Sequence, residues 1–230
     1  MNWSKFFLVP LVFLLLFISL LLVNPSVKNA INWSYGLNYY NGTGPAVLMC
    51  PGFSRTSNDF ITDGFADLLV LKGFSVYLMN YSSSPDDVEH IAVDVEHALN
   101  EVNKTNVSIV THSLCGIGVR HLLLANDSRV NHFIALAAPF NGPNFWQILY
   151  LASGDLAAEL RPGSDLMIGD NNKILYVNTT IYTVHGSSDV IVSESSSHWS
   201  YEKEHLEFTN LGHDLMDYKT VQEAVANYLK

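Results

Sequence analysis

The sequence predicts an α/β fold with a mostly parallel central sheet and helices on both of its faces. After residue 45, short apolar runs alternate with amphipathic helical patterns in the order βαβαβαβ, which requires parallel strands joined by crossover helices. No repeat, low-complexity tract or internal linker interrupts this alternation. The 230 residues, 48% of them hydrophobic, are enough for one large core and too few for two ordinary domains. We therefore expect a single domain over residues 31–230.

The first 30 residues are predicted to lie outside that domain. Residues 6–23 carry no charge and contain only Pro10 and Ser19 as interruptions, so a helix here would reach about 27 Å, close to the roughly 30 Å of a hydrocarbon core. A cleaved signal peptide usually has a shorter apolar region, and the best cleavage candidate, after Ala30, has Lys28 in the −3 place. We expect an uncleaved signal-anchor (transmembrane) helix, with a cleaved signal peptide or a buried helix as alternatives.

Glycosylation sequons support a translocated domain. Seven Asn-x-Ser/Thr sequons follow Asn2, at Asn32, Asn41, Asn80, Asn103, Asn106, Asn126 and Asn178. Chance placement of the 20 Asn and 32 Ser or Thr residues would give about three. The alternative reading is a composition that is merely rich in Asn and Ser. We expect a glycoprotein that is anchored in a membrane through residues 6–23 with its domain on the non-cytosolic side, or that is secreted.

The elements of the domain follow in order. The first buried strand, Ala46 to Cys50, ends in Pro51-Gly52, and a helical pattern from Asp59 to Leu71 leads to a strand from Phe74 to Met79. Ser84 is the expected N-cap of the next helix, because Pro85 follows it and acids fill the first turn. The remaining elements are strands at 107–110, 130–137, 181–184 and 206–208 and helices at 114–124 and 220–229.

Composition excludes several classes of function. With 12 Lys+Arg against 22 Asp+Glu the net charge is −10, which argues against nucleic acid as a partner. An aromatic content of 12% excludes a disordered chain. Cys50 and Cys115 are too few for a disulfide framework and lack metal-ligand spacing. We expect a monomer with no cofactor and no metal.

The most informative segment is Thr111-His112-Ser113-Leu114-Cys115-Gly116, between a buried strand and a helix. A serine at such a turn is exposed beyond the carboxyl end of the sheet, where active sites of these folds lie. An N-cap serine in an ordinary loop is the alternative. The segment resembles the nucleophile elbow, G-x-S-x-G, of the α/β-hydrolase family in its lipase and esterase form. Thr111 and Cys115 stand where that pattern has glycine.

Other segments resemble the same family in the same order. The strand and loop from Val47 to Phe53 resemble the strand and His-Gly-aromatic loop that supplies an oxyanion N–H, with Pro51 in place of the usual His. By this resemblance the backbone N–H groups of Phe53 and Leu114 form the oxyanion hole. Residues 137–142 and 160–166 are similar to two further lipase segments, so that the likeness extends over nearly all of residues 46–230.

The resemblance also implies a base and an acid, in the chain order Ser, Asp, His. Asp189 follows a predicted strand and is the expected acid, and His213, in a Gly-His loop before the last helix, is the expected base. His198 is the alternative base, and Glu194 and Asp214 are alternative acids. His112 is expected to be a packing or hydrogen-bonding neighbour of Ser113, and Cys115 a small buried packing residue. A disulfide between Cys50 and Cys115 is a less favoured alternative.

Residues 141–161 form a predicted insertion over the catalytic face. Its apolar residues include Phe145, Trp146, Leu149 and Tyr150, which we expect to bind the acyl chain of a substrate or to form a small lid. A helix packed on the sheet is the alternative. The predicted function is therefore a serine hydrolase that cleaves acyl esters, of small molecules or lipids, through an acyl-enzyme. A thioesterase and a non-catalytic binding protein of the same fold are the alternatives.

Overall fold

The computed structural model describes residues 36–82, 84–147 and 153–230. The predicted signal-anchor and its alternatives fall outside these residues, so they stay predictions. Within the described residues, no helix is both long and apolar enough to cross a membrane. Five of the sequon asparagines are exposed, whereas Asn80 is half-buried and accepts a hydrogen bond from the backbone N–H of Ser57 (2.8 Å).

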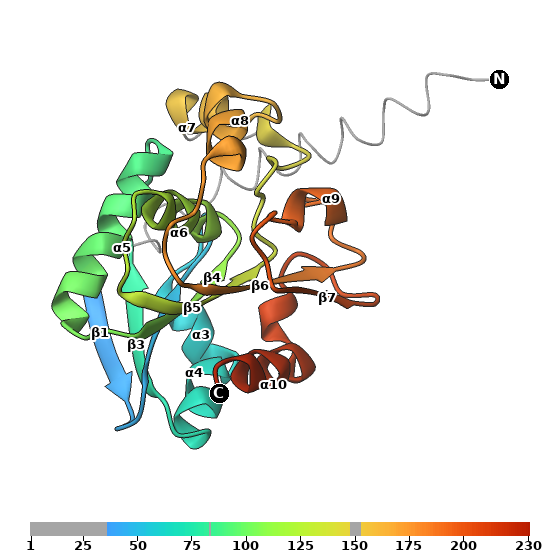
Figure 1. Cartoon of the computed structure of the whole chain (residues 1–230). Coiled ribbons are helices and arrows are strands. Elements are labelled where there is room, and N and C mark those ends of the chain that lie inside the picture. Colours follow the sequence, from blue (N-terminus) through green and yellow to red (C-terminus); the bar gives the residue numbers. More distant parts are fainter. Residues whose placement is uncertain (1–35, 83, 148–152) are drawn as a thin grey trace, which may run out of the picture. The chain divides into compact units, whose positions relative to one another are not determined.

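The described residues form a seven-stranded sheet in the order β1-β3-β2-β4-β5-β6-β7 (Figure 1). The strands are β1 (Gly36–Asn41), β2 (Ala46–Cys50), β3 (Ser75–Asn80), β4 (Val107–His112), β5 (Val130–Leu136), β6 (Thr180–Gly186) and β7 (Glu204–Phe208). All neighbouring strands are parallel except β1, which pairs with β3 in the antiparallel direction. The sequence analysis missed β1, because this edge strand is half-exposed and lacks an apolar run.

Helices cover both faces of the sheet, as predicted (Figure 1). On one face α5 (Val88–Val102) and α6 (Cys115–Leu124) enclose a core that includes Ile91, Leu99, Ile117 and Phe133. On the other face α3 (Ser57–Thr62), α4 (Phe65–Leu71) and α10 (Lys219–Tyr228) enclose a second core around Phe60, Phe65 and Val225. The strands between them are buried on both sides, which explains their continuous apolar runs.

Two predicted helix boundaries were wrong. The helix expected over residues 59–71 is divided into α3 and α4, because Gly64 between them adopts a left-handed conformation with φ of +74°. The N-cap of α5 is Asp87 rather than Ser84: the Asp87 carboxylate accepts a hydrogen bond from the backbone N–H of His90 (2.7 Å). Both positions carry capping residues, so the sequence alone did not separate them.

The second half of the predicted insertion is a helix packed on the core, which was the alternative to a lid. Helix α7 (Gly154–Leu160) buries Leu156 and Leu160 in the same core as α5 and α6. The Glu159 carboxylate accepts a hydrogen bond from the backbone N–H of Val88 at 2.8 Å, which ties α7 to the start of α5. Helix α8 (Asp165–Asn172) follows, and its buried Asp170 pairs with the buried Arg120 of α6.

The close packing of α5 on α6 depends on a glycine. A Cβ atom at Gly118 would lie 2.3 Å from Cγ2 and 2.9 Å from Cβ of Ile91, and 3.2 Å from the backbone nitrogen of Ala92. Side-chain rotation of Ile91 cannot relieve all three contacts, so the helices would have to separate. Gly169 in α8 offers the opposite case, since nothing lies within 4 Å of its Cβ position.

We expect Gly118→Ala to lower the free energy of unfolding by about 1–3 kcal/mol, because the two helices must move apart. Gly169→Ala should raise the free energy of unfolding by up to about 1 kcal/mol, because the site has room for a methyl group and alanine has a higher helix propensity than glycine. Urea denaturation followed by circular dichroism measures both. Equal effects of the two substitutions would contradict the packing argument.

Candidate active site

Ser113 occupies a sharp turn between β4 and α6. Its φ of +52° lies in the left-handed region, which is rare for a residue with a side chain. A hydrogen bond from the Ser113 backbone N–H to the carbonyl of Leu136, at the end of β5, stabilises the turn (2.8 Å). Two glycines near this turn have no room for a side chain. A Cβ atom at Gly116 would lie 2.4 Å from the Cβ of Ala138, and a Cβ atom at Gly52 would lie 3.0 Å from the Cβ of Ser113. This is the geometry of a nucleophile elbow.

The structure brings the three residues of the expected triad into one hydrogen-bonded chain. His213 Nε2 lies 2.9 Å from Ser113 Oγ, and His213 Nδ1 lies 2.8 Å from Asp189 Oδ2. The three residues come from different loops, which follow β4, β6 and β7 and are separated by up to 100 positions in the sequence. Such a chain can move a proton from the serine hydroxyl to the imidazole while the carboxylate holds the ring.

The environment of Asp189 keeps it ionised. Burial disfavours the charge, but His213 and the backbone N–H groups of Ile191 and Val192 donate hydrogen bonds to the carboxylate, and together they hold the pKa of Asp189 below its usual value. One oxygen faces the two amides and the other faces the imidazole. Asp189 therefore accepts the Nδ1–H of His213 and leaves Nε2 free to accept a proton from Ser113.

His112 fixes the backbone that carries His213. Its Nε2 lies 3.0 Å from the carbonyl oxygen of His213, and the two rings lie 5.0 Å apart. Burial and the nearby His213 lower the pKa of His112 to about 4, so the ring is neutral at pH 7 and donates from Nε2. The sequence predicts only a packing or hydrogen-bonding neighbour here, and it does not identify the partner of that bond.

The predicted oxyanion donors, Leu114 and Phe53, adjoin residues of the serine turn in the chain. Leu114 directly follows Ser113, and Phe53 directly follows Gly52, which is in close contact with the Ser113 side chain. In the described part of the chain, the backbone N–H groups of Phe53 and Leu114 donate no hydrogen bond. Two unpaired amides next to a nucleophile can stabilise a negatively charged oxygen.

An exposed apolar rim adjoins the triad acid. Val190, Ile191 and Phe145 are 68%, 41% and 53% exposed. The backbone N–H and side-chain amide of Asn144 donate hydrogen bonds to the carbonyls of Ile191 (2.8 Å) and Val190 (3.0 Å), so the two loops that carry these residues lie side by side. Trp146 is half-buried, whereas Leu149 and Tyr150 lie outside the described residues. Val190 and Ile191 were not among the predicted site residues, although they are the two residues after Asp189.

The rivals of the triad residues have other partners. His198 contacts Glu202 and His205 rather than Ser113. Asp214 forms an ion pair with Arg55, and Glu194 is exposed in the short helix α9 (Glu194–Ser197). Cys50 and Cys115 are buried free thiols, and burial and their mutual hydrogen bond raise the pKa of Cys50 well above its usual value. The structure thus does not contain the alternative disulfide.

Comparison with solved structures identifies the architecture. The described fold resembles a monoacylglycerol lipase from Paleococcus ferrophilus (TM-score 0.70, 14% identity, covering 85% of this chain and 98% of that one). It also resembles the mature lipase BlEst2 of Bacillus licheniformis (TM-score 0.72, 15% identity, 86% and 98% covered). The chain has the α/β-hydrolase fold. A bromoperoxidase from Bacillus anthracis is similar as well (TM-score 0.63, 17% identity, 85% and 95% covered), so the fold alone does not define a reaction.

No protein-family model and no curated protein matches the sequence. The α/β-hydrolase fold of this chain is therefore evident from its architecture and its motifs rather than from overall sequence similarity. The predicted fold class is confirmed, and Ser113, Asp189 and His213 lie in the loops that follow β4, β6 and β7.

The neutral state of His112 predicts a pH-dependent stability. Because the folded pKa of about 4 lies below the ordinary 6.5, the unfolded chain takes up the proton first as the pH falls. The stabilisation that neutral His112 gives the folded state is complete above pH 6.5. It is lost as the pH falls towards 4, by up to roughly 3 kcal/mol. His112→Gln keeps an N–H donor and removes the titration. We expect denaturant unfolding at pH 6.5 and 4.5 to show a smaller loss of stability for the variant, whereas equal losses would contradict the assignment.

Proposed function

We propose that the protein is a serine hydrolase that cleaves carboxylic acyl esters through Ser113, His213 and Asp189. The observation that carries the proposal is the hydrogen-bonded chain from Asp189 through His213 to Ser113, which ends on a serine at a strained turn. A histidine with an ionised acid on one nitrogen and a hydroxyl on the other is arranged to activate that hydroxyl. Packing alone does not require such an arrangement.

The reaction follows from these positions. His213 Nε2 accepts the proton of Ser113 while the serine oxygen attacks the carbonyl carbon of the ester. The carbonyl oxygen becomes negatively charged and would bind the free N–H groups of Phe53 and Leu114, each worth about 10²- to 10³-fold in rate. His213 then donates its proton to the leaving alcohol, so the acyl group remains on Ser113. A water molecule, deprotonated by the same nitrogen, releases the acid and restores the serine.

The apolar rim favours a substrate with an acyl chain. The rim consists of three exposed apolar side chains, those of Phe145, Val190 and Ile191. An acyl chain lying on them would remove this apolar surface from water. Each methylene so buried contributes about 0.8 kcal/mol. The rim lies next to Asp189, on the loop that orients the base. We therefore favour lipid-like or long-chain esters over small polar ones, and a thioester with the same acyl chain fits the same groups.

The catalytic roles predict steep losses of activity. Ser113→Ala and His213→Ala should each lower kcat for a p-nitrophenyl ester by about 10⁵-fold or more, and Asp189→Asn by about 10⁴-fold. Because the residues act as a unit, the Ser113→Ala/His213→Ala double variant should be no worse than either single one. Steady-state hydrolysis and labelling of Ser113 by a fluorophosphonate probe measure these effects.

His121→Gln is the matched control for the histidine substitution, because His121 lies on α6 and pairs with Glu89 and Asp170. It should leave turnover and labelling unchanged. A wild-type protein that neither hydrolyses esters or thioesters nor reacts with the probe would instead be a non-catalytic binding protein of this fold. Retention of near-normal turnover by His213→Ala would refute the assigned base.

The rim predicts a dependence on chain length. Replacing Phe145 and Val190 by Ser should lower kcat/KM for octanoyl or longer esters by about 10-fold, the equivalent of roughly two buried methylenes, and leave acetyl esters nearly unchanged. Ile174→Ser is the control, since Ile174 is also exposed (61%) but precedes β6, at the opposite end of that strand from Asp189. Equal losses on short and long chains would show that the rim does not bind the acyl group.

A further inference from the structure

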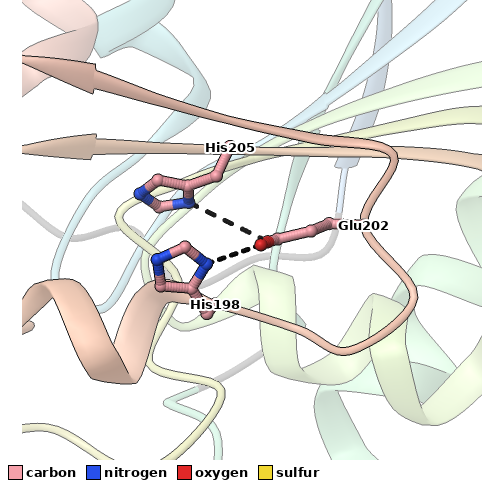
Figure 2. Close-up of side chains that lie close together, drawn as sticks. All are labelled: His198, Glu202 and His205. Carbon is pink, nitrogen blue, oxygen red and sulfur yellow. Dashed lines mark hydrogen bonds and ion pairs between the residues drawn. The ribbon is translucent and has the colours of Figure 1, made fainter.

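Two histidines and a glutamate converge where the chain passes from α9 into β7 (Figure 2). His198 Nδ1 lies 2.5 Å from Glu202 Oε1, and His205 Nδ1 lies 3.8 Å from Glu202 Oε2. The two imidazole rings are stacked, with centroids 3.8 Å apart and 27° between their planes, so both Nδ1 atoms face the same carboxylate. The three ligand atoms all lie within 4.8 Å of one another.

From this convergence we propose that His198, Glu202 and His205 bind a divalent transition-metal ion, with Zn²⁺ as the representative ion. Two imidazole nitrogens and one carboxylate are a ligand set that zinc prefers and that Mg²⁺ and Ca²⁺ do not. Ligand atoms around tetrahedral zinc are about 3.3 Å apart. Side-chain adjustments on the order of 1 Å would therefore close the site, and a water molecule could take the fourth position.

The Glu202 carboxylate is oriented by neighbouring buried groups. Oε2 of Glu202 accepts hydrogen bonds from the hydroxyl of the fully buried Thr183 and from the backbone N–H of Trp199 (3.2 Å). Thr183 Oγ1 also lies 2.7 Å from Nδ1 of His205, which faces it across the β6–β7 pair. The bonds from Thr183 and Trp199 orient the Glu202 carboxylate, as outer-shell partners do in metal sites. An ion on Nδ1 of His205 would replace the bond between that nitrogen and Thr183.

Access and charge agree with the proposal. The side chain of His198 is 42% exposed, whereas those of Glu202 and His205 are 16% and 13% exposed, so an ion can enter from the His198 side onto a mostly shielded site. The carboxylate and the net charge of −10 attract cations. None of the proposed ligands is a residue of the triad.

A metal here would fix the segment that follows the triad acid. Residues 190–203 connect Asp189 to β7 and include α9. Ser196 of α9 forms two hydrogen bonds with the loop after β5. Its carbonyl accepts one from the backbone N–H of Asn141 (3.2 Å), and its Oγ donates one to the carbonyl of Gly142 (2.7 Å). One ion shared by His198 and His205 would join both ends of the turn before β7. The expected role is structural, and it does not depend on the hydrolase activity.

Zinc titration of the full chain tests the site. The protein is purified in a mild detergent because residues 6–23 are apolar, stripped with EDTA, and titrated with ZnCl₂ against a chromophoric chelator. We expect one high-affinity ion per chain, and a rise in Tm of about 5 °C or more at a zinc concentration 100 times Kd. Ca²⁺ and Mg²⁺ should give neither response.

His198→Gln and Glu202→Gln should each weaken zinc binding by at least about 100-fold, since loss of an orienting group alone costs 10- to 100-fold. Because His198 is exposed, its substitution should leave the fold intact, and circular dichroism of the variant checks this. His121→Gln is the matched control, because its two ring nitrogens face different carboxylates. Absence of zinc binding by the wild type, or equal binding by His198→Gln, would overturn the proposal and leave a hydrogen-bonded cluster only.

Discussion

The parallel pairing of β4, β5, β6 and β7 is the constraint on which the candidate site depends. Because parallel strands end at the same edge of the sheet, the loops that follow β4, β6 and β7 meet there, although they are distant in sequence. Ser113, Asp189 and His213 stand one in each of these loops. The positive φ of Ser113 is tolerated because the buried strand and helix on either side determine the turn.

The departures from the G-x-S-x-G pattern are accommodated by packing. Thr111 continues β4 and pairs with Cys50 and Ala135, so its side chain is completely buried, and its hydroxyl has no hydrogen-bond partner in the described part of the chain. A Cβ at Gly116 would lie 3.3 Å from that hydroxyl. The missing side chain of Gly116 therefore leaves space for the threonine. An unpaired buried hydroxyl costs roughly 1–3 kcal/mol, which is a structural cost of placing Thr111 near Ser113.

The segment between β6 and β7 serves the molecule in several ways. It begins with Asp189, continues with the exposed Val190 and Ile191, and ends with the cluster of His198, Glu202 and His205. The buried Trp199 between these features stacks on Phe140 with ring centroids 5.5 Å apart. The proposed triad acid, an apolar rim and a proposed metal site are therefore carried by one short stretch.

The sequence by itself determined the layered fold and the order of the candidate residues. Continuous apolar runs directly indicate strands that helices cover on both faces of the sheet. A serine between such a run and a helix indicates the turn around Ser113. Edge strand β1 and the helix break at Gly64 escaped detection, because a half-exposed strand and an isolated glycine give weak local signals. The spacing of His198, Glu202 and His205 was visible in the sequence, but His198 was weighed only as a base.

Tertiary structure decided which groups meet. Only the sheet register places Thr183 opposite His205. Only the packing of loops brings His112 to the carbonyl of His213 and Asn144 to the loop of Ile191. Local patterns report which face of an element is apolar, since burial repeats along the chain. They do not report contacts between loops, because those contacts depend on strand order, on register and on the angle at which each loop leaves the sheet.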